Sequence, residues 1–562
     1  MGKMSAGMAV VECLRAEGIR HICGVAGSSY QEVLDSLYGR DDIQFIGTRH
    51  EQGGAFMAVG YSQALGSPSV CMATNGPGST NLVTGIAGAL MGHSPVVAIV
   101  GGISMDHMGR DAIQEIDQIS LFRPITKLAI QINRAERIPE LLRHAFRVAT
   151  TGKMGPVLVE IPRDLLNVQE MEADVQPPAK YRVPQAPEGD QEQVRAAAEI
   201  LRQARFPVVV AGGGVKWSQA AQEVLRLAEL LAAPIINSYG HNDAVPNNHP
   251  LYIGPLGRAG APEAAEALQQ ADVVLAVGTR LGQFTTFFEH RHLPREARLI
   301  QIEIDGKEIG RNFPVTAGIQ GDARAVLTAL LRILGEESPL PGGEERRQIA
   351  LGLKERRQRR LDAETEPSTQ PLKPQRVFHE LRRVVPPQAA VVFDAGAATG
   401  YGYDRLPFTD TGSFFCSLEL GCVGSGLPMA LGVKLARPEC PVVCISGDGG
   451  FMMNSQEMET AVRHGIAVVN IVLNNNCWGA EKAYQKHLYD GRYVAADITN
   501  PRFDRYAELC GALGFYAESP REIANSVHEA LASERPAVIE VPIDPEELPF
   551  PARADVFRHR LR

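Results

Sequence analysis

Residues 441–476, PVVCISGDGGFMMNSQEMETAVRHGIAVVNIVLNNN, decide the fold of this chain. The runs at 441–445 and 467–473 are apolar almost throughout, which is typical of parallel strands buried on both faces. Between them, residues 454–463 have the composition of a helix. A right-handed crossover brings the turns that follow the two strands to the same carboxyl edge of a sheet. The spacing of 27 positions between Asp448 and Asn475 therefore predicts that both lie at this edge.

These two side chains and the glycines beside them have the chemistry of a metal-bound phosphate site. Asp448 and Asn475 offer hard oxygen ligands that suit Mg²⁺, and Gly447, Gly449 and Gly450 expose backbone amides that can bind a phosphate. Taken alone, Gly-Asp-Gly is an ordinary tight turn. The flanking strands and the spacing favour the ligand site. The pattern is the diphosphate–magnesium motif of thiamine-diphosphate enzymes, and the chain resembles this family.

Composition and charge are those of a large soluble enzyme. The chain has 562 residues, of which 22% are charged and 44% hydrophobic, enough for three to four domains. A net charge of -9 argues against a nucleic-acid partner. No apolar run is long enough to predict a membrane span. The nine scattered cysteines are typical of reduced thiols, which predicts a cytoplasmic protein.

Two proline-rich, charged stretches, 173–190 and 335–374, divide the chain into three blocks. Each block alternates short apolar runs with helical segments, the pattern of parallel α/β sheets. In the middle block the expected strands are 207–212, 272–278 and 299–305. The predicted fold class is α/β with three doubly wound parallel-sheet domains, which is the layout of the family. The expected units are a pyrimidine-binding domain at 1–172, a central Rossmann-like domain at 190–335, a diphosphate- and magnesium-binding domain at 370–547, and a tail at 548–562.

The first block supplies a candidate catalytic glutamate. RHEQGG at 49–54 follows the strand-like residues 43–46 and opens a helix. Glu51 matches the family's glutamate that bonds to the aminopyrimidine ring of the cofactor, which helps the cofactor to lose its thiazolium proton. The alternative is a helix N-terminal glutamate stabilised by the helix dipole. The diphosphate motif in the same chain favours the catalytic role.

Two further segments of the first block resemble the family. TNGPGSTN at 74–81 is similar to its glycine-proline-glycine turn before a helix, which assigns Gly76 to cofactor binding, with a purely structural turn as the alternative. Gln114 matches a glutamine that faces the substrate, with a solvated helix face as the alternative. The resemblance also implies that Glu51 and the metal motif of one site come from different subunits. The active unit is therefore expected to be at least a homodimer, and two dimers are expected to form a homotetramer.

The resemblance assigns more cofactor contacts in the last block. Val423 takes the place of the apolar residue beneath the bent cofactor, where related synthases usually carry methionine. Residues 393–399 stand where the family has a glycine-glutamine-histidine-glutamine stretch that touches the diphosphate. Ala397 and Ala398 cannot make those side-chain bonds, so backbone amides and Thr399 are expected to replace them.

Other contacts complete the expected site. The backbone carbonyl of Cys477 is expected to be the third protein ligand of Mg²⁺, beside Asp448 and Asn475. Gly421 and Gly479 are expected to lie against the cofactor. FAD is a further candidate, without support from the sequence. Whether FAD or the ADP part of a coenzyme A binds the central domain stays open.

The segment CWGAEKAYQ at 477–485 bears on the reaction. The resemblance is closest to the acetolactate-synthase-like branch, whose synthases have an apolar residue where Glu481 stands and tryptophan where Tyr484 stands. Trp-Gly-Ala-Glu-Lys instead resembles sulfoacetaldehyde acetyltransferases. We expect Glu481 to exchange protons with the substrate in a mainly apolar pocket. The alternative is that Glu481 and Lys482 form a solvated pair on a helix.

Three reactions are therefore considered, each through a carbanion carried by the thiazolium ring. The first converts sulfoacetaldehyde and phosphate to acetyl phosphate and sulfite. The second is the decarboxylation or ligation of 2-ketoacids by an acetolactate synthase-type enzyme. The third is a 2-hydroxyacyl-CoA lyase, in which Glu481 would move the hydroxyl proton. A non-enzymatic regulator is a fourth reading, against which the intact Glu51, Asp448 and Asn475 argue.

Overall fold

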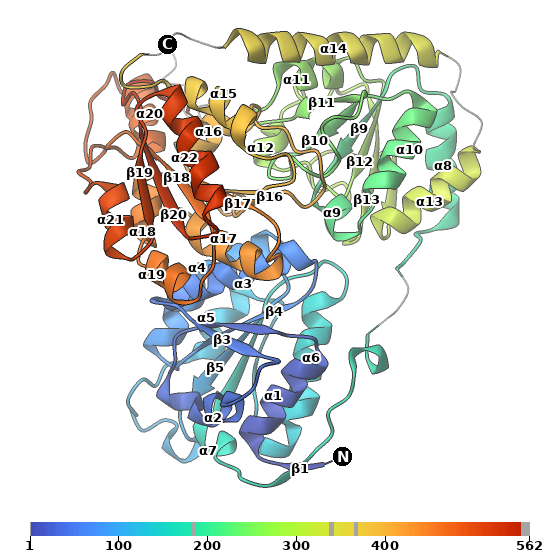
Figure 1. Ribbon diagram of the computed structural model, residues 1–562. Helices are drawn as coiled ribbons and strands as arrows, with labels where there is room; N and C mark the ends of the chain where they lie inside the picture. Colours follow the sequence, from blue (N-terminus) through green and yellow to red (C-terminus); the bar gives the residue numbers. More distant parts are fainter. Residues whose placement is uncertain (1, 183–185, 336–341, 365–368, 552–562) are drawn as a thin grey trace.

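The computed structural model describes residues 2–182, 186–335, 342–364 and 369–551. This part of the chain forms three six-stranded parallel sheets, each flanked by helices (Figure 1). The sheets fall within the three blocks expected from the sequence. In each sheet the first strand lies inside the sheet and later strands add on both of its sides, which is doubly wound topology. The predicted fold class is confirmed.

The first sheet has the strand order β3-β2-β4-β5-β7-β6. Its strands are strongly apolar, and all seven residues of β5 are buried, as expected of a strand covered on both faces. A short antiparallel pair, β1 with β8, ties the start of the chain to the end of this domain. The elements are β1 (Gly2–Met4), α1 (Ala6–Ala16), β2 (His21–Gly24), α2 (Gln31–Leu37), β3 (Gln44–Gly47), α3 (Glu51–Leu65), β4 (Ser69–Ala73), α4 (Pro77–Met91), β5 (Val96–Gly102), α5 (Gln118–Phe122), β6 (Leu128–Gln131), α6 (Ile138–Thr150), β7 (Val157–Pro162), α7 (Arg163–Leu166) and β8 (Met171–Ala173).

The central sheet has the strand order β11-β10-β9-β12-β13-β14. The three strands predicted in this block are confirmed as β9, β12 and β13. The elements are α8 (Gln191–Arg202), β9 (Pro207–Ala211), α9 (Gly213–Trp217), α10 (Ala221–Leu231), β10 (Ile235–Asn237), β11 (Tyr252–Pro255), α11 (Pro262–Gln269), β12 (Val273–Val277), α12 (Gln283–Thr286), β13 (Arg298–Glu303), β14 (Ala317–Gln320), α13 (Ala323–Leu334) and the long charged helix α14 (Gly343–Ala363).

The third sheet has the strand order β16-β15-β17-β18-β20-β19. The two strands predicted around the aspartate and asparagine turns are the neighbours β17 and β18. The elements are α15 (Pro374–Val384), β15 (Ala390–Phe393), α16 (Ala397–Gly402), β16 (Phe414–Cys416), α17 (Gly426–Ala436), β17 (Val442–Gly447), α18 (Asp448–Met453), α19 (Glu457–Arg463), β18 (Val469–Asn474), α20 (Gly479–Leu488), α21 (Phe503–Leu509), β19 (Leu513–Tyr516), α22 (Pro520–Ala532) and β20 (Ala537–Pro542).

The crossover between β17 and β18 differs from the single helix that the sequence predicts. A first helix, α18, begins at Asp448 itself, and a second, α19, follows after a break at residues 454–456. At this break the side-chain amide of Asn454 donates to the carbonyl of Gly424 at 2.7 Å. The break between α18 and α19 is therefore attached to the loop that precedes α17.

The first and third domains meet through helices α3 and α17, which pack at glycines. A Cβ on Gly60 would lie 2.2 Å from the carbonyl oxygen of Met429, and one on Gly432 would lie 1.9 Å from that of Met57. Neither position tolerates a side chain, because real contacts of a Cβ with backbone are much longer. The two helices therefore approach through their backbones, and each carries a glycine that allows it.

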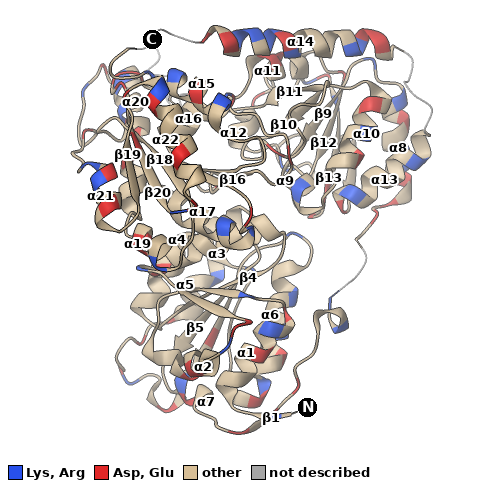
Figure 2. Ribbon diagram, in the orientation of Figure 1, with Lys and Arg blue, Asp and Glu red and all other residues tan. Residues whose placement is uncertain are grey.

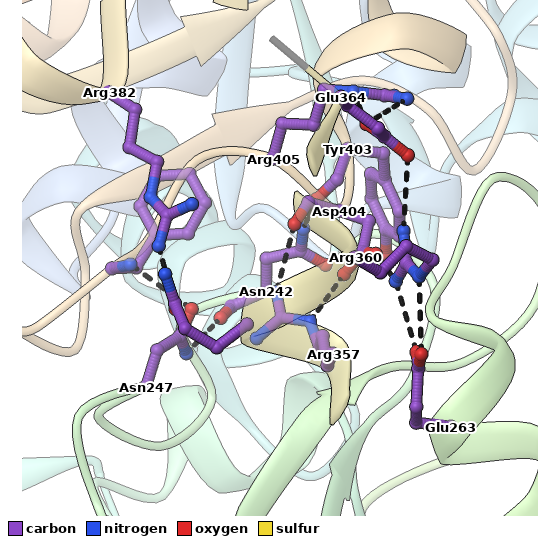
Figure 3. A network of polar contacts seen from close by, with 12 residues as sticks. Asn242, Asn247, Glu263, Arg357, Arg360, Glu364, Arg382, Tyr403, Asp404 and Arg405 are labelled. Carbon is purple, nitrogen blue, oxygen red and sulfur yellow. Dashed lines mark hydrogen bonds and ion pairs between the residues drawn. The ribbon is translucent and has the colours of Figure 1, made fainter. Parts of the chain in front are cut away.

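The central and third domains are joined through α14, which lies along the top of the central domain in Figure 1 and reaches α15 of the third domain with its C-terminal half. Asp404 is buried and accepts hydrogen bonds from Arg357 at 2.7 Å and from Arg360 at 2.6 Å (Figure 3). Arg360 also pairs with Glu263 at 3.0 Å. Because buried charges must be paired, this network fixes the position of α14 against both domains.

The surface carries charges of both signs. Lysines and arginines are interspersed with aspartates and glutamates over the helices of all three domains (Figure 2). Among the described helices, none combines the length and the apolar character needed to cross a membrane. All nine cysteines lie in the described part of the chain and are free thiols.

Candidate functional site

The predicted metal ligands lie at the carboxyl edge of the third sheet. Strands β17 and β18 pair in parallel with Gly447 opposite Leu473, so Asp448 leaves its strand beside the asparagine turn. Asp448 is only 2% exposed, and its Oδ1 accepts a hydrogen bond from the amide of Gly449 at 2.9 Å. Burial raises the pKa of Asp448 to about 6, although hydrogen bonds from Gly449 and Asn500 act in the opposite direction.

The second and third predicted ligands lie in the turn after β18. Asn475 is 7% exposed, and Asn476 has a φ of 51°, a left-handed conformation that asparagine tolerates. Cys477 lies opposite Asp497 in an antiparallel bridge whose hydrogen bonds are made by the residues on either side. In such a non-hydrogen-bonded pair the carbonyl of Cys477 points away from the neighbouring segment. It is therefore free to face a ligand.

This donor set fits Mg²⁺. Asp448 offers a carboxylate, Asn475 a side-chain amide and Cys477 a backbone carbonyl, so all three donors are hard oxygens. Magnesium usually takes a few protein oxygens and completes its shell with phosphate oxygens and water. The turn thus suits a cation that also holds a diphosphate.

The glycines of the motif differ in the space around them. A Cβ on Gly449 would lie 2.6 Å from the ring of Trp478, and one on Gly450 would lie 2.5 Å from Oδ2 of Asp394. A Cβ on Gly447 would meet nothing within 4 Å. Gly449 and Gly450 are therefore required by close packing, whereas Gly447 borders open space at the end of the strand.

The loop that carries Val423 is held by Asp394, a residue that the sequence analysis did not single out. Asp394 is 1% exposed, and its carboxylate accepts a hydrogen bond from the amide of Gly424 at 2.9 Å. Burial raises the pKa of Asp394 to about 7, against backbone hydrogen bonds that lower it. Val423 borders the phosphate motif, since a Cβ on Gly450 would lie 3.6 Å from its Cγ1. Gly421, in the same loop, is exposed and has a φ of 79°.

Thr399 and Gly479 lie differently with respect to residues 475–477, the turn after β18 that carries two of the predicted metal ligands and is called the metal turn below. The hydroxyl of Thr399 is buried and donates to the carbonyl of Asp394 at 2.8 Å, so this arrangement does not support the predicted contact with a diphosphate. Gly479 lies beside the turn. A Cβ on Gly479 would lie 3.2 Å from the side-chain nitrogen Nδ2 of Asn475 and 3.1 Å from the Cβ of Ala397.

Glu51 lies in a second cluster, at the carboxyl edge of the first sheet. It is the first residue of α3, directly after the turn that follows β3. Asn81 donates a hydrogen bond to Oε2 of Glu51 at 2.9 Å. A Cβ on Gly78 would lie 3.3 Å from Oε1. The carboxylate therefore rests against the predicted glycine-proline-glycine turn.

Gly76 and Gln114 belong to the same cluster. Gly76 has a φ of 63°, and a Cβ there would lie 2.8 Å from the Cβ of Gln114. Asn75 donates to the carbonyl of Gln114 at 3.1 Å. Gln114 itself is exposed, as the alternative of a solvated residue expects, but it lies in a turn with a φ of 66° and not on a helix.

Glu457 connects the two clusters, although the sequence analysis did not identify it. Its carboxylate is 0% exposed and accepts hydrogen bonds from the amides of Arg49 at 3.2 Å and His50 at 3.1 Å. Burial raises the pKa of Glu457, while these bonds and one from Thr460 lower it. The contact between the domains thus runs through the residues just before Glu51. A glutamate on the apolar face of α19 was the available signal in the sequence.

Comparison with known proteins identifies the family. The model described as "Thiamine pyrophosphate enzyme, N-terminal TPP binding domain" matches residues 4–121. The models of the central domain and of the C-terminal TPP binding domain match residues 194–330 and 394–541. The chain belongs to the thiamine pyrophosphate enzyme family.

Whole-length relatives narrow the group. A probable acetolactate synthase large subunit of Methanocaldococcus jannaschii is 37% identical over 97% of this chain and 93% of its own length. A sulfoacetaldehyde acetyltransferase of Alcaligenes xylosoxydans xylosoxydans is 34% identical over 100% of this chain and 96% of its own. The acetolactate synthase isozyme 3 large subunit of Escherichia coli is 33% identical over 98% and 97%. This thiamine pyrophosphate enzyme is thus one of the acetolactate synthase and sulfoacetaldehyde acetyltransferase group.

Helix α20 of this thiamine pyrophosphate enzyme leaves directly from the metal turn. Glu481 lies in its first turn and is exposed in the single chain, whereas the sequence analysis expects a mainly apolar pocket. The side chain of Lys482 is only 7% exposed, and its ammonium lies 3.1 Å from a carboxylate oxygen of Asp497 and 3.1 Å from one of Glu546. The alternative of a solvated Glu–Lys pair is therefore wrong for Lys482.

The segment after β20 covers part of the same helix. Lys486 joins Lys482 in pairing with Glu546, and the ring of Phe550 lies 5.7 Å from that of His487. A Cβ on Gly400 would lie 3.1 Å from Pro549. The first residues of the predicted tail thus pack on the third domain, and residues 552–562 of that tail lie outside the described residues.

A separate cavity of 1580 Å³ lies where the three domains of this thiamine pyrophosphate enzyme meet. Gly213 and Thr279 line it from the central sheet, Lys153 from the first domain and Glu419 from the third. Burial raises the pKa of Glu419 to about 7. Ligands of doubly wound sheets bind at such a crevice beyond the carboxyl ends of the strands. The question whether FAD or the ADP part of a coenzyme A binds the central domain is therefore a question about this cavity.

Replacing Glu457 by alanine is expected to destabilise the enzyme markedly. The substitution leaves the amides of Arg49 and His50 without their acceptor, at about 1–3 kcal/mol for each buried group. Glu459→Ala is the matched control on the same helix, because Glu459 forms only exposed pairs and should change stability by less than about 1 kcal/mol. Thermal unfolding followed by circular dichroism compares the two. Equal unfolding midpoints for the two variants would contradict the stabilising role of Glu457.

Proposed function

We propose that this enzyme is a sulfoacetaldehyde acetyltransferase-like enzyme that converts sulfoacetaldehyde and phosphate to acetyl phosphate and sulfite. The observation that carries the proposal is the segment Trp478–Lys482, which starts at the metal turn and places Glu481 in the first turn of α20. The relative of that name, aligned over the whole chain, supports it. We place the enzyme in the cytoplasm, in agreement with its free thiols.

The metal site is proposed to hold Mg²⁺ and the diphosphate of the cofactor. Asp448, Asn475 and the carbonyl of Cys477 would bind the cation, and the backbone around Gly447 to Gly450 would face the phosphates. Val423 would support the rings from below. Thiamine diphosphate, when bound, supplies a carbon nucleophile that adds to the substrate carbonyl.

The residues of this chain would then move protons. Glu51 would share a proton with the aminopyrimidine ring. Glu481 would give a proton to the aldehyde oxygen of the substrate as that carbon is attacked, and would take it back when the carbonyl of the acetyl group forms. Between these steps the aldehyde carbon loses its hydrogen as a proton, sulfite leaves from the neighbouring carbon, and that carbon gains a proton to become the methyl group. Gln114, in the cluster of Glu51, would face the substrate. The resemblance to the family implies that Glu51 of one subunit serves the metal turn of another, so the active unit is proposed to be a homodimer, paired into a homotetramer.

Acetolactate synthase-type chemistry on 2-ketoacids is the second candidate, supported by the synthases among the relatives. A 2-hydroxyacyl-CoA lyase is the third, supported by the acidic residue at Glu481 and the large cavity. Both use the same cofactor site. They differ in the substrate that α20 and its surroundings accept.

A substrate panel distinguishes the three reactions. Purified enzyme with Mg²⁺ and thiamine diphosphate is incubated with sulfoacetaldehyde and phosphate, with pyruvate, or with a short 2-hydroxyacyl-CoA. Acetyl phosphate and sulfite, identified by mass, are the expected products, and acetyl phosphate should disappear when phosphate is omitted. Acetolactate from pyruvate, with no turnover of sulfoacetaldehyde, would reject the proposal in favour of the second candidate.

Glu51→Gln is expected to lower turnover by about 10²-fold or more, the scale of lost proton-transfer catalysis, while cofactor binding persists. Steady-state kinetics with the best substrate of the panel and calorimetric cofactor binding measure the two effects. Glu136→Gln, at an exposed glutamate of the same domain, is the control and should leave both unchanged. Near-normal turnover of Glu51→Gln would rule out its catalytic role.

Glu481→Gln is expected to reduce kcat much more than it weakens cofactor binding, because the lost interaction belongs mainly to the transition state. Lys482→Ala should change KM by no more than a few-fold, since two carboxylates already neutralise its ammonium. Lys486→Ala is the matched control on the same helix. Lys486 pairs with Glu546, whereas Lys482 pairs with both Asp497 and Glu546. Unchanged kinetics in Glu481→Gln would remove the main support for the acetyltransferase.

A further inference from the structure

A short segment, residues 495–500, lines the metal turn on its outer side. It runs antiparallel to residues 476–478, and backbone hydrogen bonds of 2.7 and 2.9 Å join the two segments. The segment ends at Asn500, shortly before α21. No motif of the sequence analysis includes it.

The side-chain amide of Asn500 ties the two turns of the metal site together. Its Nδ2 donates to Oδ2 of Asp448 at 2.8 Å. The same nitrogen lies 3.2 Å from Oδ1 of Asn474 and 3.2 Å from Oδ1 of Asn476. Two hydrogens thus serve three acceptors, one from the turn after β17 and two from the turn at the end of β18.

The acceptors of Asn500 are themselves held in place. Oδ1 of Asp448 accepts from the amide of Gly449 at 2.9 Å, so each carboxylate oxygen has an N–H donor and keeps a further lone pair. Asn474 donates to the buried Glu540 at 2.8 Å, and Glu540 also accepts from the amide of Phe503 at 2.7 Å. The network is therefore anchored on β20 and α21, and the carboxylate of Asp448 is fixed in orientation.

We propose that Asn500 is a positioning residue of the magnesium site. It presets the carboxylate of Asp448 and the distance between the two turns, so that the cation binds without rearranging them. This inference rests on the proposed function, because it assumes that Asp448 and Asn475 bind Mg²⁺. An amide suits the role better than a carboxylate would, since it donates hydrogens to Asp448 without adding a second negative charge beside it.

The test is a Mg²⁺ titration of thiamine diphosphate binding to the full-length protein, followed by calorimetry. Asn500→Leu keeps a similar volume but has no N–H, and should need about 10–100-fold more Mg²⁺ for half-saturation, the usual effect of losing a partner behind a metal ligand. Saturating Mg²⁺ should restore binding. Asn500→Ser, which keeps one donor, should fall between this variant and the wild type. Asp448→Ala should show no Mg²⁺-dependent binding at all.

Midpoints of thermal unfolding, measured without metal and cofactor, distinguish a positioning role of Asn500 from a purely structural one. Asn247→Leu is the matched control, because Asn247 also makes three hydrogen bonds at a buried site, between the central and third domains. It should lower the midpoint and leave the Mg²⁺ requirement unchanged. If Asn500→Leu and Asn500→Ser also lower the midpoint and leave the Mg²⁺ requirement unchanged, as Asn247→Leu does, the inference is overturned. Should Asn500→Leu not fold, the Mg²⁺ requirement of Asn500→Ser decides.

A different result would overturn the proposed site itself. If the wild type binds no thiamine diphosphate, or if Asp448→Ala binds it as tightly as the wild type does, the cofactor site is wrong and the role of Asn500 falls with it. A different outcome would reject the positioning role alone. In it, the wild type binds thiamine diphosphate, Asp448→Ala shows no Mg²⁺-dependent binding, and both Asn500 variants have an unchanged Mg²⁺ requirement.

Discussion

The buried carboxylate of Glu457 is the interaction on which the site most depends. It belongs to the crossover that carries Asp448, yet it binds the two amides that directly precede Glu51. A buried carboxylate without such donors would be costly, so the two segments stabilise each other. The close approach of α3 and α17 at their glycines makes this contact geometrically possible. One chain thereby holds the edge that carries Glu51 and the edge that carries Asp448 in a fixed relation.

This fixed relation has a consequence for a dimer. If Glu51 serves the metal turn of the neighbouring subunit, Glu457 connects the metal turn of one site to the glutamate of the other. The two sites of a dimer would then share rigid structure as well as residues. The connection consists of short helices, backbone amides and one carboxylate, with no long flexible segment between them.

The sequence was sufficient to predict the features that depend on local pattern. Continuous apolar runs identified β17, β18, β9 and β12, and the spacing of Asp448 and Asn475 placed both at one sheet edge. Features that depend on distant partners could not be read in this way. Thr399 looks available to a phosphate until its hydroxyl is seen to bond to Asp394, and Lys482 looks solvated until Asp497 and Glu546 are placed beside it.

The strand order also determines when during synthesis the site can form. Strand β18, which leads into the metal turn, is bordered by β20, and β20 comes from residues 537–542, well after the turn in the sequence. The turn therefore lacks one flank until residues 537–542 have left the ribosome. Until residues 426–436 of α17 have been made, α3 also lacks the helix that packs on it, and the face of α3 toward α17 is uncovered. Domains made first usually fold first, so the nascent chain passes through a stage in which the face of α3 that packs on α17 is uncovered and the turn after β18 is not yet flanked on both sides.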